Sequence, residues 1–257
     1  MLEKVNPKKK LGQNFLINKF TINKISEIIN ISADDLILEV GPGQGALTEN
    51  IIKKTKNYIG IEKDSNLCKI LKSNYGDKIT LRNEDILETN FKNIYNRKYR
   101  VIGNIPYNIS TKLLLKCIEN KEDITNIHFM MQKEFVDRIV SEHGNKSYGR
   151  LTVLIQLFFI VEKYIDIDPK DFYPPPKIHS SFMSLTPRKK ILLAKDEIED
   201  FLVFSKFIFS TRRKKIKNCI NIRSINLYDN MDKRAEELTI IEMIKLFRDI
   251  RNDGEFV

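Results

Sequence analysis

Apolar residues in the first 190 positions form short continuous runs, which alternate with stretches where apolar side chains recur every three or four residues. The runs are typical of strands buried on both faces, and the wider spacing is typical of amphipathic helices. This alternation predicts an α/β fold with a mostly parallel sheet. The strands are expected at residues 36–40, 58–61, 79–81, 99–103, 125–131, 161–167 and 180–185, and the helices at about 19–30, 46–54, 64–75, 133–141 and 150–158.

From about residue 190 the pattern becomes wholly helical. A stripe of apolar side chains runs from Ile198 to Phe209, and Thr239-Ile240-Ile241-Glu242 has the form of a capping box that opens a last helix. We therefore expect two domains, a larger one at residues 1–188 and a small all-helical one at residues 189–257.

A glycine-rich turn, Glu39-Val40-Gly41-Pro42-Gly43-Gln44-Gly45, follows the first predicted strand. Glycines let the backbone approach a ligand closely, and a helix N-terminus behind them supplies free N–H groups, so the turn predicts a nucleotide cradle. Gly45 follows Gly43 by two residues, whereas the dinucleotide fingerprint spaces its second and third glycines by three. With the acidic Glu39, this spacing resembles the first motif of S-adenosylmethionine-dependent methyltransferases more than that of dehydrogenases.

Acidic residues follow the next two strands. Glu62 ends the second strand about twenty residues after the first glycine, where a carboxylate is placed to accept from both ribose hydroxyls. In methyltransferase folds the loop after the third strand contacts the adenine, and here that loop reads Asn83-Glu84-Asp85-Ile86. Asp85 is expected to accept from the exocyclic amine, with Glu84 as the alternative.

The fourth strand runs into Asn104-Ile105-Pro106-Tyr107, a candidate for the chemistry itself. An exocyclic adenine amine is a poor nucleophile because its lone pair is delocalised into the ring. The Asn104 side-chain carbonyl and the Pro106 backbone carbonyl could accept its two hydrogens and favour sp³ geometry, while proline adds no competing N–H. Tyr107 offers a face for an extruded base. Methyl transfer from a sulfonium then depends mostly on positioning and electrostatics.

Positive charge is concentrated in two segments of the 257-residue chain. Of the formal net charge of +10, residues 1–24 carry +5 and residues 187–223 carry +7, whereas residues 25–186 carry only +1. Two basic segments beside a nearly neutral body indicate an anionic polymer as the partner, because phosphate contacts supply most non-specific nucleic-acid affinity. The clusters are Lys8-Lys9-Lys10 and Arg212-Arg213-Lys214-Lys215.

Other features narrow the class of protein. A hydrophobic content of 42% with 15 Phe is ample for a core. No apolar run reaches membrane-spanning length, and the N-terminus lacks the apolar core of an export signal. Cys68, Cys117 and Cys219 lack metal-ligand spacing and are expected to be reduced thiols. We therefore expect a cytoplasmic protein without a membrane contact or a metal.

Together these motifs resemble those of the ribosomal RNA adenine dimethyltransferase family, from about Lys8 to Phe247. Leu11-Gly12-Gln13-Asn14-Phe15-Leu16 resembles the N-terminal motif of the family, Asn104-Ile105-Pro106-Tyr107 its catalytic motif, and the run from Phe209 to Lys215 its basic C-terminal motif. Ile105 stands where monomethylating DNA enzymes usually carry proline, and dimethylation needs room for an already methylated amine.

The resemblance implies a Rossmann-like class I methyltransferase fold, with a seven-stranded mixed sheet whose last strand is antiparallel. It implies that S-adenosylmethionine, converted to S-adenosylhomocysteine, methylates the N6 amines of two adjacent adenosines near the 3′ end of small-subunit ribosomal RNA. The partner would be an immature small subunit, and the protein is expected to act as a monomer without a metal.

The resemblance also implies roles for single residues. Asn14 and Leu16 would contact the methyl donor, and Phe172, in an F-x-P-x-P-K pattern, would sandwich the flipped adenine with Tyr107. The expected donor-binding residues are Asn14, Leu16, Gly41, Gly43, Glu62, Asp85 and Asn104; the expected catalytic residues are Asn104, Pro106, Tyr107 and Phe172; the expected RNA-binding residues are Lys8, Lys9, Lys10, Arg212, Arg213 and Lys214.

Two alternatives remain. The large-subunit adenine methyltransferases of macrolide resistance share the fold and the catalytic motif, but their N-terminal motif usually reads S-Q-N-F and they lack this arginine motif. The other alternative is a non-catalytic RNA-binding assembly or transcription factor on the same fold. Decay of Gly41, Glu62, Asp85 or Asn104 would favour it, and all four are intact.

Overall fold

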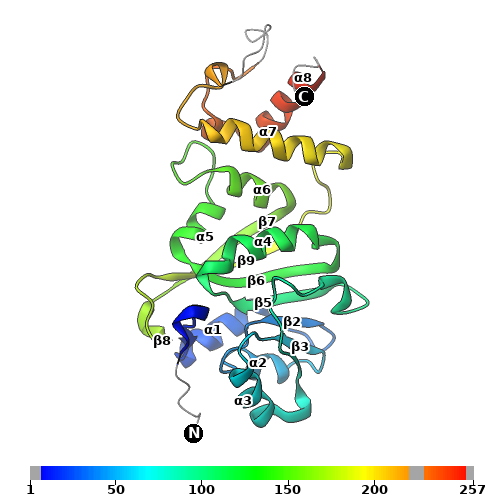
Figure 1. Ribbon diagram of the computed structural model, residues 1–257, viewed down its shortest axis with the longest axis vertical. Helices are drawn as coiled ribbons and strands as arrows, with labels where there is room; N and C mark the ends of the chain where they lie inside the picture. The colour runs from blue at the N-terminus through cyan, green and yellow to red at the C-terminus, as the bar shows by residue number, and fades with distance from the viewer. Residues whose placement is uncertain (1–6, 220–228, 253–257) are drawn as a thin grey trace. The chain divides into compact units, whose positions relative to one another are not determined.

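The α/β pattern corresponds to a seven-stranded sheet in the computed structural model, which describes residues 7–219 and 229–252 (Figure 1). The strand order is β4-β3-β2-β5-β6-β9-β7. β9 runs antiparallel to β6, whereas the pairs from β4 to β6 are parallel. The predicted mixed sheet with an antiparallel last strand is therefore confirmed. The strands are β2 (Ile37–Val40), β3 (Tyr58–Ile61), β4 (Thr80–Arg82), β5 (Tyr99–Asn104), β6 (Ile124–Gln132), β7 (Phe159–Ile167) and β9 (Ser180–Pro187).

The chain divides into two compact units. The first contains residues 1–136 and 160–187, and the second contains residues 137–159 and 188–257. The boundary expected after residue 188 lies next to a change of unit, and the second unit also takes in residues 137–159 from the middle of the chain. The division at residue 188 into a methyltransferase domain and a small RNA-binding domain stays a prediction.

Two helices of the first unit begin where side chains accept hydrogen bonds from free backbone N–H groups. The Asn18 side chain accepts from two such groups at the start of α1 (Lys19–Ile29), and Asp64 accepts from one at the start of α3 (Ser65–Tyr75). α2 (Thr48–Ile52) is shorter than the helix expected at residues 46–54. The remaining helices that begin in this unit are α4 (Ser110–Glu119), for which the sequence pattern predicted no element, and α5 (Lys133–Ile139).

The core of the first unit explains the apolar runs. β2 and β3 are buried at every position, as expected for central parallel strands that are covered on both faces. Ile25 and Ile29 of α1 belong to the same buried cluster as Ile37 of β2. A Cβ atom at position 103 would lie 2.6 Å from the Val40 carbonyl oxygen, so Gly103 is required where β5 passes β2.

A second, two-stranded sheet joins parts of the chain that are far apart in sequence. β1 (Phe15–Leu16) pairs antiparallel with β8 (Phe172–Tyr173), with Phe15 opposite Tyr173 and Leu16 opposite Phe172. The buried Asp171 carboxylate accepts hydrogen bonds from the side chains of Asn18 and Thr21, each at 2.7 Å. These contacts hold the N-terminal motif against the motif that begins at Phe172.

The second unit is helical in its described part. It contains α6 (Arg150–Phe158), α7 (Ile198–Ser210), α8 (Ile240–Asn252) and short 3₁₀ turns; residues 220–228 and 253–257 of the expected helical domain lie outside the described residues. The rings of Phe201 and Phe204 on α7 lie 5.5 and 5.6 Å from Phe247 on α8, forming an aromatic cluster in its core. Within the described ranges, no helix is long and apolar enough to span a membrane.

Candidate active site

A pocket opens at the carboxyl ends of β2, β3 and β5, the edge at which open α/β sheets bind ligands. Strand register explains why its parts meet. Val40 pairs with Ile61 on one side and with Gly103 on the other, so the next residues, Gly41, Glu62 and Asn104, emerge side by side. All seven expected donor-binding residues line this pocket: Asn14, Leu16, Gly41, Gly43, Glu62, Asp85 and Asn104.

The glycine turn forms the pocket wall next to β2. Gly41 and Gly43 have φ values of 63° and Gly45 has 88°, in the left-handed region that favours glycine. A Cβ atom on Gly43 would also lie 3.3 Å from the Phe15 ring. The glycines therefore permit both the turn and its close contact with the N-terminal motif.

Glu39, the first residue of the glycine-rich segment, has a structural role. Its carboxylate is buried and accepts from the Thr48 hydroxyl at 2.7 Å and the Tyr58 hydroxyl at 2.6 Å. Burial raises the pKa of Glu39 to about 7, although both hydrogen bonds oppose the shift. Glu39 thus connects β2 to the first residue of α2 and to β3.

Glu62 is the carboxylate expected to accept from ribose hydroxyls. Its Oε2 atom accepts from the Gly43 N–H at 3.0 Å, and Oε1 accepts from the Asp64 N–H at 2.9 Å. Burial raises the pKa of Glu62, with the backbone hydrogen bonds opposing. Each carboxylate oxygen keeps capacity for a further donor, so the group can accept from a ligand while it stays fixed.

Asp85 and Glu84 both line the pocket, and the choice between them as adenine partner stays open. Asp85 forms an ion pair of 2.7 Å with Lys63 and accepts from the Leu87 N–H at 2.9 Å. Burial alone would raise the pKa of Asp85, but the contacts with Lys63 and Leu87 outweigh it and lower the pKa. Glu84 is exposed and accepts from Thr89 at 3.2 Å.

The Asn104-Ile105-Pro106-Tyr107 motif forms the opposite wall. The Asn104 side-chain amide donates to the Asn14 carbonyl oxygen at 2.9 Å. Among the described residues, none donates a hydrogen bond to Asn104 Oδ1. The Pro106 carbonyl accepts from the Ile109 N–H at 3.1 Å and keeps a second lone pair. The Tyr107 hydroxyl contacts the Ser180 hydroxyl at 2.7 Å, and burial raises the pKa of this tyrosine.

Phe172 does not line the pocket with these residues. Its side chain is only 3% exposed and packs in the core cluster of Leu16. The adjacent Tyr173 is 54% exposed and lies across from Phe15. The structure therefore brings Tyr107 to the pocket without Phe172, and the sandwich of the two rings stays a prediction.

The expected RNA-binding cations differ in their surroundings. Lys8 pairs with Asp64 at 2.7 Å and Lys10 lines the pocket, while the Lys9 side chain lies outside the described part of the chain. In the second unit, Arg212 donates through two nitrogens to Glu236 and also to the Lys146 carbonyl oxygen at 2.7 Å. Arg213 and Lys214 are exposed and form no ion pair with any described residue.

Sequence reasoning missed two sets of contacts in the site. It assigned no partner to Asp64, although an acid just before a predicted helix is a capping signal, and no role to Gln13. It also missed the bonds of Glu39 to Thr48 and Tyr58. Each partner lies on a different segment, so local spacing carries no signal for the contact.

Among residues 7–219 and 229–252, no group of three or more His, Cys, Asp or Glu side chains is placed to hold a metal ion.

The sheet order and the glycine turn after its first strand define a class I methyltransferase fold. The crystal structure of a dimethyladenosine transferase from Plasmodium falciparum matches with a TM-score of 0.83 and 25% identity, covering 95% of this chain and 100% of that one. The 23S rRNA methyltransferase ErmE matches with a TM-score of 0.76 and 24% identity, covering 93% of this chain and 100% of that one, which shows the fold.

The sequence comparison defines the family. The chain matches the ribosomal RNA adenine dimethylase family over residues 4–250 and belongs to that family. It is 41% identical to ribosomal RNA small subunit methyltransferase A of Wigglesworthia glossinidia brevipalpis over 244 residues, covering 91% of this chain and 94% of the relative. It is 39% identical to the protein of the same name from Neisseria meningitidis serogroup A over 212 residues, 82% of each chain.

Proposed function

We propose that this protein is an S-adenosylmethionine-dependent methyltransferase that dimethylates the N6 amines of two adjacent adenosines near the 3′ end of small-subunit ribosomal RNA. One observation carries the proposal: the seven expected donor-binding residues and the Asn104-Ile105-Pro106-Tyr107 motif line the same pocket. The relatives named ribosomal RNA small subunit methyltransferase A support the choice of substrate.

The residues present fit this donor. Glu62 would accept from the ribose hydroxyls, and Asp85 or Glu84 from the adenine amine. Asn14 and Leu16 would contact the donor from the N-terminal motif, and Gly41 and Gly43 allow the backbone to approach it closely. S-adenosylmethionine supplies an electrophilic methyl group on a sulfonium. We propose that no metal takes part.

The acceptor side of the pocket would prepare the adenine. Asn104 Oδ1 and the Pro106 carbonyl oxygen would accept the two N6 hydrogens, because each keeps a free lone pair. Tyr107 would stack on the extruded base, with its hydroxyl held by Ser180. The methylated nitrogen loses its proton readily, so this chemistry needs no strong base. Positioning would supply most of the acceleration.

The partner would be an immature small ribosomal subunit, and the protein would act as a monomer in the compartment where that subunit is assembled, the cytoplasm. Binding and then leaving an immature subunit would also give the protein a role in small-subunit biogenesis. Arg213 and Lys214 are proposed to contact RNA phosphates, because both are exposed and unpaired among the described residues.

The test is to incubate the protein with labelled S-adenosylmethionine and either unmethylated small subunits or large-subunit RNA, and then to map the label. We expect label on two adjacent adenosines of the small subunit. Label confined to large-subunit RNA would support the macrolide-resistance type instead, and ErmE shares this fold. Absence of label on both RNAs, with RNA binding retained, would support a non-catalytic factor.

Asn104→Ala tests the chemical assignment in the same assay. Loss of the acceptor should reduce single-turnover methyl transfer by about 10²–10³-fold, the cost of removing one transition-state hydrogen bond. Binding of S-adenosylhomocysteine, measured by titration calorimetry, should stay mostly intact. Asn104→Asp is the matched comparison, because it keeps an acceptor at Oδ1 while it loses the donation to the Asn14 carbonyl oxygen and adds a negative charge. Retained dimethylation by Asn104→Ala would overturn the assignment.

A further inference from the structure

The N-terminal segment at residues 8–16, here termed the strap, runs along one side of the pocket. Seven consecutive residues, 10–16, line it. The strap contacts the Asn104-Ile105-Pro106-Tyr107 motif, where the Asn14 carbonyl oxygen accepts from the Asn104 side chain at 2.9 Å. Gly12 also lies close to this motif, because a Cβ atom there would be 3.5 Å from Pro106 Cβ. The strap is therefore part of the donor site.

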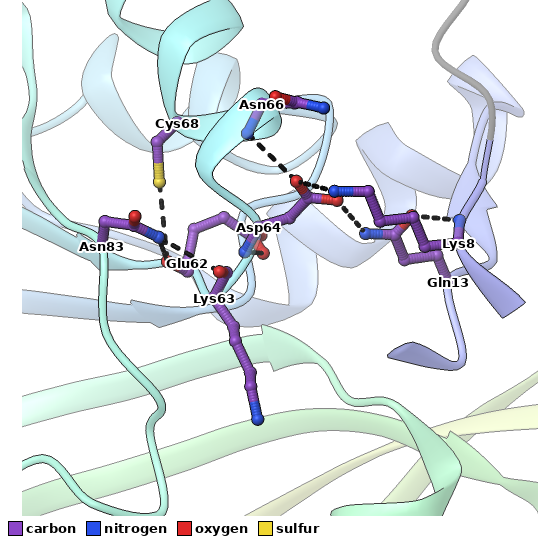
Figure 2. Close-up of polar contacts among 8 residues, drawn as sticks. All are labelled: Lys8, Gln13, Glu62, Lys63, Asp64, Asn66, Cys68 and Asn83. Carbon is purple, nitrogen blue, oxygen red and sulfur yellow. Dashed lines mark hydrogen bonds and ion pairs between the residues drawn. The ribbon is translucent and has the colours of Figure 1, made fainter. Parts of the chain in front are cut away.

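The strap is also held at two of its residues, Lys8 and Gln13, by Asp64, which lies after β3 (Figure 2). The Asp64 side chain is 1% exposed. It accepts from Lys8 Nζ at 2.7 Å, from Gln13 Nε2 at 3.0 Å and from the Asn66 N–H at 3.0 Å. Gln13 Oε1 in turn accepts from the Lys8 N–H at 2.7 Å. Lys8 and Gln13 of the strap thus contact the same buried carboxylate.

Asp64 is connected directly to the donor cradle. Its N–H donates to Glu62 Oε1 at 2.9 Å, and Glu62 Oε2 accepts from the Gly43 N–H at 3.0 Å. The Asn83 side chain donates to the Glu62 carbonyl oxygen at 2.8 Å and stabilises this turn (Figure 2). A continuous series of hydrogen bonds therefore leads from Lys8 to the glycine turn.

The electrostatics favour a closed strap. Asp64 and Glu62 are buried carboxylates two residues apart, so a nearby cation offsets their like charge. A buried carboxylate that loses its cation is strongly destabilised. Burial by itself would raise the pKa of Asp64, but hydrogen bonds from Lys8, Gln13 and Asn66 outweigh it and lower the pKa. Lys8 Nζ is the only cation within ion-pair distance of Asp64 among the described residues. Opening the strap would leave this charge without its partner.

We propose that Lys8, Gln13 and Asp64 form a latch that holds the strap closed over the methyl donor. Lys8 is then a positioning residue for donor binding, acting through Asp64, and not primarily a contact to RNA phosphate. The identity of the donor rests on the proposed function. Because the strap lines the pocket, the donor enters and leaves when the latch opens, so weakening the latch speeds donor release.

The test measures donor affinity without RNA. Lys8→Met should weaken binding of S-adenosylhomocysteine about tenfold in titration calorimetry, mostly through a faster off-rate, with kcat at saturating donor little changed. Hydrogen exchange of the backbone amides at residues 8–14 should become faster. Lys8→Arg should retain the donor affinity and the slow exchange of the wild-type protein, because it keeps a cation for Asp64.

Two further variants separate the latch from general effects of charge and folding. Lys24→Met removes an exposed lysine of the same basic segment that itself forms no ion pair with any described residue, and it should change neither donor affinity nor strap exchange. Asp64→Asn keeps the helix cap and removes the charge, so it should resemble Lys8→Met. The double variant Lys8→Met/Asp64→Asn should bind the donor no more weakly than the more weakly binding single variant, because both changes break the same ion pair.

Equal affinity of Lys8→Met and the wild-type protein for S-adenosylhomocysteine, with unchanged strap exchange, would overturn the latch. A selective loss of affinity of Lys8→Met for a 3′ fragment of small-subunit RNA, beyond that of Lys24→Met, would then make Lys8 an RNA contact. Failure of the wild-type protein to bind S-adenosylhomocysteine would contradict the proposed function instead, so the two failures are distinguishable.

Discussion

At the residue scale, burial separates side chains that have similar positions in the sequence motifs. Phe172 and Tyr173 are neighbours at the start of the proline-rich motif, yet one is 3% exposed and the other 54% exposed. Antiparallel pairing with Phe15 and Leu16 directs successive side chains to opposite faces. The sequence pattern marked the motif, and the pairing of β1 with β8 determined which aromatic ring enters the core.

Phe172 should therefore contribute to stability. Phe172→Ala is expected to lower the free energy of unfolding by about 3–5 kcal/mol, as for other large-to-small changes in a core. Tyr173→Ala should change it by less than about 0.5 kcal/mol, because most of its side chain is exposed. Urea denaturation measures both. An equal, small effect of the two variants would contradict the buried position of Phe172.

The sandwich predicted for Phe172 needs a variant that stays folded. Phe172→Leu keeps an apolar side chain in the core and removes the aromatic face. If Phe172 stacks on the target adenine, this variant should show slower methyl transfer with unchanged donor affinity. Unchanged transfer would restrict Phe172 to its structural part and leave Tyr107 as the stacking residue.

At the element scale, the sequence predicted every strand of the seven-stranded sheet, whereas it missed the two-residue strands and one helix. Parallel strands buried on both faces produce continuous apolar runs, so β2, β3 and β5 were found from sequence. A two-residue strand such as β1 or β8 has no period to detect. α4 was missed although Leu113, Leu114 and Cys117 are buried at helical spacing. α4 begins at Ser110, directly after the 3₁₀ turn Tyr107–Ile109, which starts at the last residue of the catalytic motif.

The basic segment at residues 212–215 divides in the structure into paired and unpaired cations. Arg212 is held by Glu236 and the Lys146 carbonyl oxygen, and Lys215 forms an ion pair of 3.1 Å with Asp232. Arg213 and Lys214 have no such partner among the described residues. The four cations that resemble one motif in sequence are thus expected to have different functions.

Arg213→Ala/Lys214→Ala should weaken RNA binding and lower the slope of log affinity against log salt by about 2, or about 1 per phosphate contact, with little change in thermal stability. Arg212→Ala should mainly destabilise the second unit, because Glu236 Oε2 loses the hydrogen bonds from two Arg212 nitrogens. Filter binding at several salt concentrations and thermal unfolding measure these effects. Unchanged RNA affinity of the double variant would mean that these cations are only a solvated surface.

At the scale of the whole molecule, Glu39 links the site to overall stability. Its folded pKa of about 7 lies above the ordinary value of 4.5, so the folded state binds a proton more tightly than the unfolded state. Its contribution to stability is fully present below about pH 4.5, and is lost as the pH rises towards about 7. A buried acid behind the donor cradle therefore disfavours folding at neutral pH.

Glu39→Gln should remove this dependence. The Gln oxygen can still accept from Thr48 and Tyr58, and it carries no charge to desolvate. Relative to wild type, the variant should gain stability between pH 5 and pH 8, by on the order of 3 kcal/mol. Urea denaturation at both pH values measures the gain. An equal difference between the two proteins at pH 5 and pH 8 would contradict the raised pKa.

Local sequence determined the class of fold and the identities of most pocket residues, because strand runs, the glycine turn and the Asn104-Ile105-Pro106-Tyr107 motif depend on neighbouring positions alone. Only the tertiary structure decided which distant residues meet. Register places Gly41, Glu62 and Asn104 in one row, and β1 pairs with β8. Likewise Lys8, read from sequence as part of an RNA-binding tail, lies against the buried Asp64, because chain folding and not spacing brings a cation to a carboxylate.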